Sequence, residues 1–124
     1  MEYKLTDAEI TLMNIIWNGG EVKAVDIAEA AGKQTGWKKN TVYTMLSRLI
    51  DKKLIERREP GFVCVPLVTK ENVGLAESVS VVEKFYDGSL SLFARAFLRE
   101  KKLTAEDIDE LIAAIKDAMS ELCR

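Results

Sequence analysis

Residues 37–55, WKKNTVYTMLSRLIDKKLI, decide the fold of this chain, because their periodicity predicts one helix with two unlike faces. Val42, Met45, Leu46 and Leu49 repeat at helical spacing and form an apolar face suited to a core. The opposite face is polar, and its residues are Asn40, Thr44, Ser47 and Asp51, flanked by Thr41, Tyr43 and Arg48. A solvated helix usually carries Glu and Lys instead, which favour helix formation. Short hydrogen-bonding side chains with one long cation suit base edges and phosphates in a DNA groove. This face alone does not exclude the alternative that the helix is an ordinary surface helix.

Two shorter helices are predicted before this stretch. The first begins with a capping box, in which Thr6 is followed three residues later by Glu9, and it ends at a pair of glycines. The second is expected over residues 23–31 and ended by Gly32, and a turn through residues 33–36 leads into the third helix. Two helices joined by a short glycine-containing turn, the second with a polar outer face, are typical of a helix-turn-helix.

A β-hairpin is predicted after the third helix. Residues 54–58 and 62–67 alternate like strands, and the Pro60-Gly61 pair between them is a turn signal. Such a hairpin after three helices makes a wing, and its arginines, Arg57 and Arg58, are expected to meet the phosphate backbone. The sequence therefore predicts a mainly α-helical fold with a small β-hairpin wing, a winged helix over residues 1–70.

Composition limits the classes of function. The chain has 124 residues and no histidine, which removes the usual general base and the commonest metal ligand. Neither a membrane span nor a secretory signal is present in the sequence, so a cytoplasmic protein without membrane insertion is expected. Cys64 and Cys123 form no spaced framework and are expected to be free thiols. No metal, no cofactor and no enzymatic activity are predicted.

The charge is divided unevenly along the chain. The formal net charge is −2, yet residues 33–58 contain eight lysines and arginines against two acids. From residue 71 onward, eleven acids outnumber seven bases. A basic first part and an acidic second part suggest that only the first part contacts a polyanion.

Residues 71–124 are predicted to form three more helices, and each carries an apolar stripe. Three helices this short offer a thin core by themselves, so pairing with the same segment of a second chain is expected. A homodimer would also place two winged helices about a two-fold axis, which suits an inverted-repeat DNA site. The predicted dimerisation residues are Leu75, Val79, Val82, Tyr86, Phe93, Phe97, Ile108, Leu111, Ile112, Ile115 and Met119.

Four stretches, in order along nearly the whole chain, carry a family resemblance. They are residues 7–17 (DAEITLMNIIW), 41–49 (TVYTMLSRL), 84–90 (KFYDGSL) and 103–111 (LTAEDIDEL). With them the chain resembles the penicillinase-repressor family, the BlaI/MecI type that also includes copper-responsive repressors. The resemblance implies a homodimeric winged-helix repressor that binds an inverted repeat of TACA/TGTA-type half-sites and blocks a promoter.

The resemblance also implies which residues contact the operator. Thr41, Thr44 and Arg48 match the family pattern, whereas Asn40 stands where lysine is usual and Tyr43 where glutamine is common. The full set of predicted DNA-binding residues is Lys38, Lys39, Asn40, Thr41, Tyr43, Thr44, Ser47, Arg48, Arg57 and Arg58.

Regulation is less well defined by the resemblance. In the penicillinase-repressor branch, a membrane-bound β-lactam sensor triggers cleavage of an Asn-Phe bond, and the matching bond here is Ala96-Phe97. A sensor protease is therefore one predicted partner, and the alternative is that Phe97 is a core residue. The paired Cys-x-Cys motifs of the copper-responsive branch are missing, since Cys123 stands alone.

Two other classes of protein fit the sequence less well than a repressor. A winged helix that binds proteins instead of DNA should carry apolar or acidic residues on its third helix, and this one carries Asn, Thr, Ser and Arg. An enzyme should show a phosphate-binding glycine loop or a nucleophile beside a base, and neither pattern is found.

Overall fold

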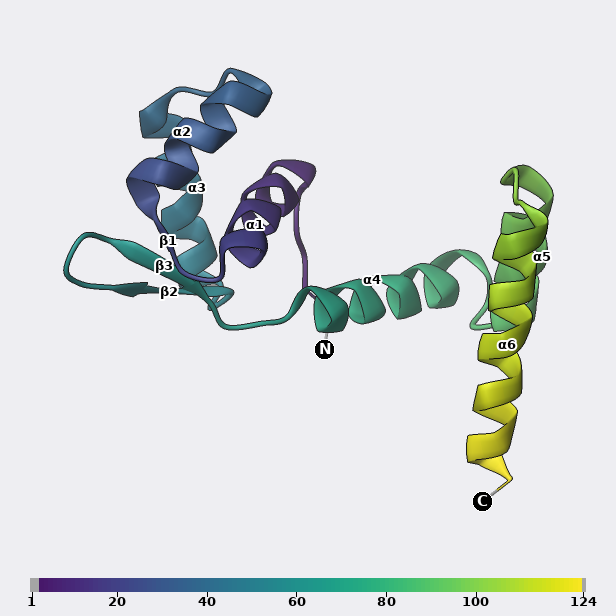
Figure 1. Cartoon of the computed structure of the whole chain (residues 1–124). Helices are drawn as coiled ribbons and strands as arrows, with labels where there is room; N and C mark the ends of the chain where they lie inside the picture. Colours follow the sequence, from purple (N-terminus) through teal and green to yellow (C-terminus); the bar gives the residue numbers. More distant parts are fainter. Residues whose placement is uncertain (1–2, 124) are drawn as a thin grey trace. The chain divides into compact units, whose positions relative to one another are not determined.

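The computed structural model describes residues 3–123, and within that range it contains six helices and three short strands (Figure 1). In chain order these are α1 (Asp7–Gly19), β1 (Val22–Lys23), α2 (Ala24–Thr35), α3 (Lys39–Asp51), β2 (Ile55–Arg58), β3 (Val63–Pro66), α4 (Lys70–Phe85), α5 (Leu90–Glu100) and α6 (Ala105–Leu122). The predicted class, mainly helical with a β-hairpin wing, is confirmed.

The chain divides into two compact units, one ending at Ser80 and the other beginning at Val81, so the division falls inside α4. Val73 in the first turns of α4 is buried, which explains why the start of α4 belongs to the first unit. The functional boundary expected between residues 70 and 71 remains a prediction.

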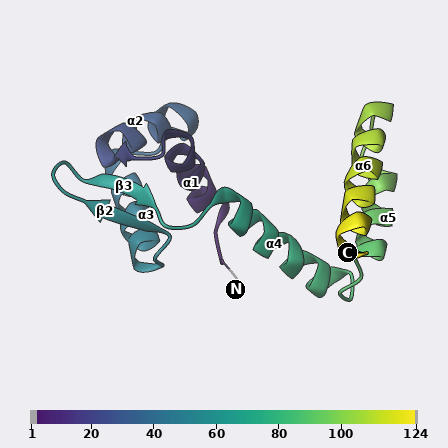
Figure 2. The same ribbon diagram turned by 60° about the horizontal axis from the view of Figure 1, so that its bottom comes forward.

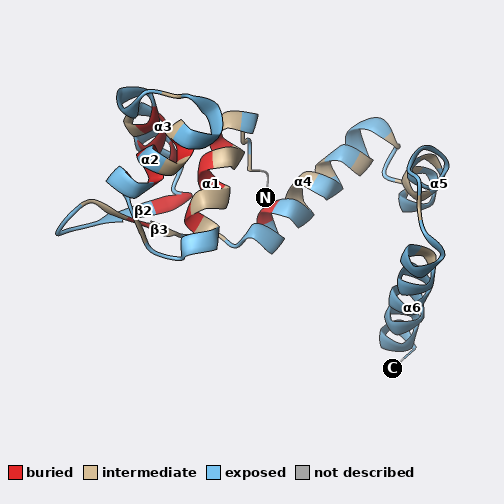
Figure 3. Cartoon of the chain, turned by 45° about the horizontal axis from the view of Figure 1, so that its top comes forward, coloured by how far each residue is buried: buried red, intermediate tan, exposed pale blue. Residues whose placement is uncertain are grey.

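The first unit is built around one hydrophobic core (Figure 3). The apolar face predicted for α3 is confirmed, since Val42, Met45, Leu46 and Leu49 are all buried. The buried residues that meet them come from α1, α2, the sheet and the residue before β2: Leu12, Met13, Ile16, Ala24, Ile27, Ala28, Ala31, Leu54, Ile55 and Cys64. Because α3 is fixed along its apolar face, its polar face is held outward.

The third helix is shorter than the sequence predicted. The expectation of one helix over residues 37–55 is wrong at both ends, because α3 begins at Lys39 and ends at Asp51. Lys53 takes a positive φ of 62°, and Leu54 donates its backbone N–H back to the carbonyl of Leu49. The chain leaves the helix here because Leu54 and Ile55 are buried, and Ile55 starts β2.

The second helix is longer than predicted. Gly32 lies inside α2, and the helix continues to Thr35, so the expected end at Gly32 is wrong. Gly36 takes over the capping role with a left-handed backbone (φ 80°), and its N–H donates to the carbonyl of Gly32. The Thr35 hydroxyl also donates to the carbonyl of Ala31 within the last turn of α2.

The strands form a three-stranded antiparallel sheet in the order β1-β3-β2. The predicted hairpin is confirmed with slightly shorter strands, and its turn includes Gly61 at φ 91° and Phe62 at φ 51°. The sequence did not predict β1, because two residues carry no recognisable alternation. Val22 pairs with Cys64 and Lys23 with Val63, so β1 lies beside the half of β3 nearest the hairpin turn and leads directly into α2.

Helices α5 and α6 begin as the sequence predicted. Ser89 caps α5 by accepting the N–H of Leu92, and Thr104 forms a capping box with Asp107 at the start of α6. Asp87 and Gly88 both take positive φ values and end α4. The expected break over residues 68–72 is shorter than predicted, since α4 already begins at Lys70.

An ion pair ties the start of α1 to the end of α3. The capping box of Thr6 and Glu9 is confirmed, and Glu9 is almost fully buried. Lys52 donates to both carboxylate oxygens of Glu9 at 2.9 Å and to the carbonyl of Lys4 at 3.1 Å. Burial raises the pKa of Glu9, but the bonds from Lys52 and Thr6 outweigh it, so the pKa lies below its ordinary value.

We expect this pair to make the stability of the fold depend on pH. Because the pKa of Glu9 is lower in the folded chain, its ionised carboxylate stabilises the fold at pH values above the pKa it has in the unfolded chain. This stabilisation is lost as the pH falls through the pKa of Glu9 in the folded chain. Glu9→Gln should therefore unfold more easily than the parent chain at neutral pH, with a difference that shrinks in acid. Urea titrations across that range measure it. Lys52→Met, which leaves the buried Glu9 without its partner, should destabilise more than Glu9→Gln at neutral pH; the reverse order would contradict the pairing.

Candidate nucleic-acid interface

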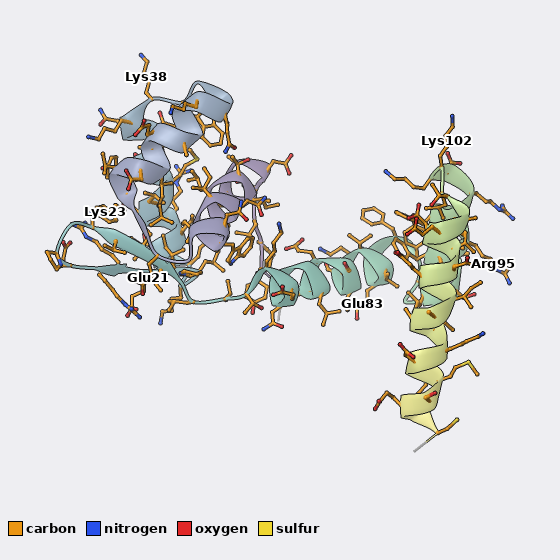
Figure 4. The ribbon with its side chains drawn as sticks, viewed as in Figure 1. Glu21, Lys23, Lys38, Glu83, Arg95 and Lys102 are labelled. Carbon is orange, nitrogen blue, oxygen red and sulfur yellow. The ribbon has the colours of Figure 1, made fainter. Side chains whose placement is uncertain are left out.

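The polar face predicted for α3 lies on the surface. Lys38, Lys39, Asn40, Thr41, Thr44, Ser47 and Arg48 are all exposed, and Tyr43 at their flank is half-buried. Figure 4 shows Lys38, the N-cap of α3, pointing away from the fold. Within the described part of the chain, Asn40, Thr41 and Arg48 engage no protein partner through their side chains. The structure thus brings the predicted α3 residues together on one helix face that is free for a partner.

Two hydroxyls on this face are already oriented by the helix. Thr44 donates to the carbonyl of Asn40 at 3.0 Å, and Ser47 donates to the carbonyl of Tyr43 at 3.2 Å. With the hydroxyl hydrogen engaged, each oxygen turns its lone pairs outward, and Thr44 also offers its methyl group. This side of α3 therefore offers hydrogen-bond acceptors and a methyl contact, whereas Arg48 and the lysines offer donors.

The start of α3 is favourable to an anion. Lys38 precedes the helix and makes no side-chain cap, Lys39 is its first residue, and the first turn contains no acid. Unpaired backbone N–H groups and the helix dipole add partial positive charge at the same end. A phosphate would therefore be attracted to the end of the helix from which the polar face begins.

The two wing arginines, which are predicted to contact phosphates, each pair with acidic residues of the protein. Arg58 pairs with Glu56 at 3.0 Å and with Glu21 at 3.2 Å, and Figure 4 shows Glu21 beside the hairpin. Arg57 pairs with Glu59, and this bond holds the pKa of Glu59 below its ordinary value. Water and salt screen exposed pairs of this kind, so a phosphate can compete for either arginine.

The pairing of Arg58 with Glu21 was not predicted. The two residues are 37 positions apart and meet only because β1 pairs with β3. Helix α3 and the hairpin, which carry the candidate DNA-binding residues, lie together in the first unit, as Figure 2 shows.

The C-terminal helices expose the apolar stripes on which the sequence predicted a dimer. No described residue of α5 or α6 is buried, and Figure 3 shows no red on either helix. Leu75, Val79, Phe97, Leu111, Ile112, Ile115 and Met119 are exposed, while Val82, Tyr86, Phe93 and Ile108 are half-buried. Within the second unit, the ring of Phe93 contacts the rings of Tyr86 and Phe97, with 5.3 Å and 5.9 Å between ring centroids. Folding of the single chain therefore leaves most of this apolar surface in water.

The cysteines do not form a reactive site. Cys64 is fully buried in β3, and burial raises its pKa to about 11, which keeps it as an unreactive thiol. Cys123 is exposed at the end of α6. Among residues 3–123 no cluster of metal-ligating side chains is found, and none of the helices there is long and apolar enough to cross a membrane.

Solved structures with this fold include a known repressor. The solution structure of the DNA-binding domain of the repressor BlaI matches with a TM-score of 0.53 and 28% identity, over 58% of this chain and 93% of that one. The solution structure of monomeric Bacillus licheniformis BlaI in complex with the blaP half-operator matches with a TM-score of 0.52 and 27% identity, over 58% of this chain and 90% of that one.

Sequence comparison extends the likeness beyond the winged helix. The chain is 28% identical over 116 residues to the penicillinase repressor of Bacillus licheniformis, a match covering 92% of this chain and 91% of the relative. It is 29% identical over 111 residues to the methicillin resistance regulatory protein MecI of Staphylococcus aureus strain N315, covering 88% of this chain and 90% of MecI. The family model described as penicillinase repressor matches residues 5–117, and the chain therefore belongs to the penicillinase repressor family.

Proposed function

We propose that this protein is a transcriptional repressor that binds an inverted-repeat operator as a homodimer and blocks transcription until an inducing signal arrives. The observation that carries the proposal is the exposed face of α3, where Asn40, Thr41, Thr44, Ser47 and Arg48 lie together without partners from other elements. Membership of the penicillinase repressor family supports DNA as the partner, as does the structure of the relative BlaI bound to a half-operator.

Different side chains suit the base edges and the phosphates. Thr44 and Ser47 present acceptors, which suit the amino groups of adenine or cytosine, and the Thr44 methyl suits the methyl of thymine. Arg48 and the lysines at the start of α3 suit phosphates on either side of the groove. The wing arginines add phosphate contacts, Arg58 once its acidic partners are displaced and Arg57 through the terminal amino groups that Glu59 does not engage.

A homodimer is supported by the apolar surface of the C-terminal helices. With no buried residue in α5 or α6, these helices gain a core only by covering their stripes, and a second copy supplies a matching surface. The two-fold axis of such a dimer would match an inverted repeat, with one α3 in each half-site.

Selection of bound duplexes from a random DNA pool, followed by titration at several salt concentrations, tests this function. We expect the pool to converge on an inverted repeat and the logarithm of the affinity to fall steeply with the logarithm of the salt concentration. If no sequence is enriched and binding is weak at every salt concentration, the polar face of α3 has a protein partner instead.

Thr44→Ala and Arg48→Ala should separate base reading from phosphate binding. Thr44→Ala should cost about 1–3 kcal/mol and relax the preference at one base pair, while Arg48→Ala should weaken binding to every sequence and reduce the salt dependence. Titration of each variant against the selected duplex and its single-base variants measures both effects. Thr44→Val, which keeps the methyl and removes the hydroxyl, serves as the matched control for a contact to thymine. Equal losses on specific and random duplexes for both alanine variants would contradict this division.

We also propose a sensor protease as a regulatory partner that would cut at Ala96-Phe97. This bond lies within α5, so a protease would have to unwind the helix, and α5 has no buried residue to oppose local opening. The exposed Phe97 ring also suits the dimer surface, which is the competing role. Electrophoresis of the chain from cells before and after induction distinguishes the two, since an intact chain excludes cleavage.

A further inference from the structure

One aromatic side chain joins the wing to the DNA-reading helix. The guanidinium carbon of Arg57 in β2 lies over the ring of Phe62, 3.7 Å from its centroid. The ring of Tyr43 in α3 packs edge-on against Phe62 with 5.6 Å between centroids, and Lys39 lies 5.6 Å from the Tyr43 ring. Phe62 therefore stands between a cation of the wing and the helix that presents the polar face.

The backbone of Phe62 is held as firmly as its ring. Its N–H donates to Glu59 within the hairpin turn at 3.2 Å, and its carbonyl accepts the N–H of Ala24, the first residue of α2, at 2.9 Å. Its φ of 51° is costly for a bulky side chain, so surrounding contacts must keep it there. Phe62 thus contacts α2, α3 and the wing at once.

The stack also determines what Arg57 can do. Glu59 engages the Nε of Arg57 and Phe62 covers one face of its guanidinium, while the terminal amino groups have no protein partner among the described residues. An arginine on a flexible hairpin would lose side-chain entropy on reaching a phosphate, but a stacked one has lost much of it already.

We propose that Phe62 is a positioning residue for DNA binding: it holds Arg57 at a fixed place relative to α3, and Tyr43 acts in the same stack through its ring. This inference rests on the proposed function, since it names how the wing meets phosphate. It assigns Tyr43 to the support of the wing rather than to base reading, and it assigns Phe62 a role that the sequence did not suggest.

Phe62→Leu is the decisive variant, because leucine keeps apolar volume against Tyr43 and offers no flat face to Arg57. Its affinity should fall about eightfold at 0.1 M salt, on the selected duplex and on a random duplex of equal length alike. The slope of log affinity against log salt should fall by about 1, while the preference for the selected sequence is kept. Phe62→Tyr keeps the ring and should bind like the parent chain.

A double-mutant cycle with Arg57→Ala separates positioning from general weakening of the fold. If Phe62 acts through Arg57, the double variant loses no more affinity than Arg57→Ala alone. If Phe62→Leu lowers the DNA affinity as much in the Arg57→Ala background as in the parent chain, the proposal is overturned. Thermal melting of each full-length variant identifies any that fails to fold. If Phe62→Leu fails, the DNA affinities of Phe62→Tyr and Arg57→Ala carry the test.

The stack can also be tested without DNA, which keeps this inference distinct from the function on which it rests. The ring of Phe62 should shift the side-chain protons of Arg57 upfield in the NMR spectrum of the free protein. Tyr43→Leu should reduce that shift by releasing Phe62, and Tyr43→Phe, which loses only the hydroxyl, should preserve it together with DNA affinity. An Arg57 shift that ignores Tyr43→Leu, or a Tyr43→Phe variant that loses binding, overturns the role given to Tyr43. If the parent chain binds neither duplex, the function fails while the stack can still be observed.

Discussion

Ile112→Asp in α6 should convert the protein to a monomer and lower its affinity for a full inverted repeat by about a hundredfold to a thousandfold. Ile112 lies in the middle of the apolar stripe and is 45% exposed in the single chain, so the charge would be buried only when a second copy covers it. Loss of the dimer turns two linked half-site contacts into one, and the advantage of linkage is of this size.

Ala113→Asp is the matched control, because it places the same charge on the same helix but outside the apolar stripe. It should remain dimeric and bind the full repeat normally. Sedimentation equilibrium gives the oligomeric state, and titration against a full and a half-site duplex gives the two affinities. Binding of Ile112→Asp to the half-site should be unchanged. If Ile112→Asp stays dimeric, α6 is excluded from the dimer surface.

Leu46→Ala should reduce the free energy of unfolding by about 2–5 kcal/mol, a large fraction of what an ordinary domain possesses. Leu46 is fully buried at the centre of the apolar face of α3, where it meets residues of α1 and α2. The cavity left by alanine would loosen the one face that fixes α3, so DNA binding should weaken together with stability.

Urea unfolding followed through the fluorescence of Trp17 and Trp37, both in the first unit, measures this loss. Leu67→Ala is the control, because Leu67 is the same residue type at 52% exposure and should change stability by less than about 1 kcal/mol. Equal effects of the two substitutions would mean that α3 is not anchored by its apolar face.

The sequence allowed those parts of the fold to be predicted that depend on neighbouring residues. The α3 core face follows from helical periodicity, and the caps at Thr6 and Thr104 follow from side chains that bond within one turn. The predicted end of α2 was wrong because Gly32 stops a helix only when no better cap follows. Gly36 is that better cap. Strand β1 was missed because its pairing partner lies in the wing.

The candidate site shows the same division between near and distant contacts. The polar residues of α3 were predicted to be exposed together, and they are, because a single helix places them. The engagement of Arg58 by Glu21 could not be predicted, since it depends on how the wing meets the segment before β1, and the stack of Arg57 on Phe62 could not be predicted, since it depends on the backbone conformation of the hairpin turn. The family resemblance is confirmed by the match over residues 5–117.

The lack of any buried residue in α5 and α6 has a consequence for the amount of protein in a cell. If these helices acquire an interior only by pairing, their melting temperature must rise with protein concentration, by mass action. Newly made or diluted chains would then carry a loosely ordered C-terminal half and a fully formed winged helix. Control of the target promoter would depend on the number of chains present as well as on the inducing signal, with a threshold below which the operator is left open.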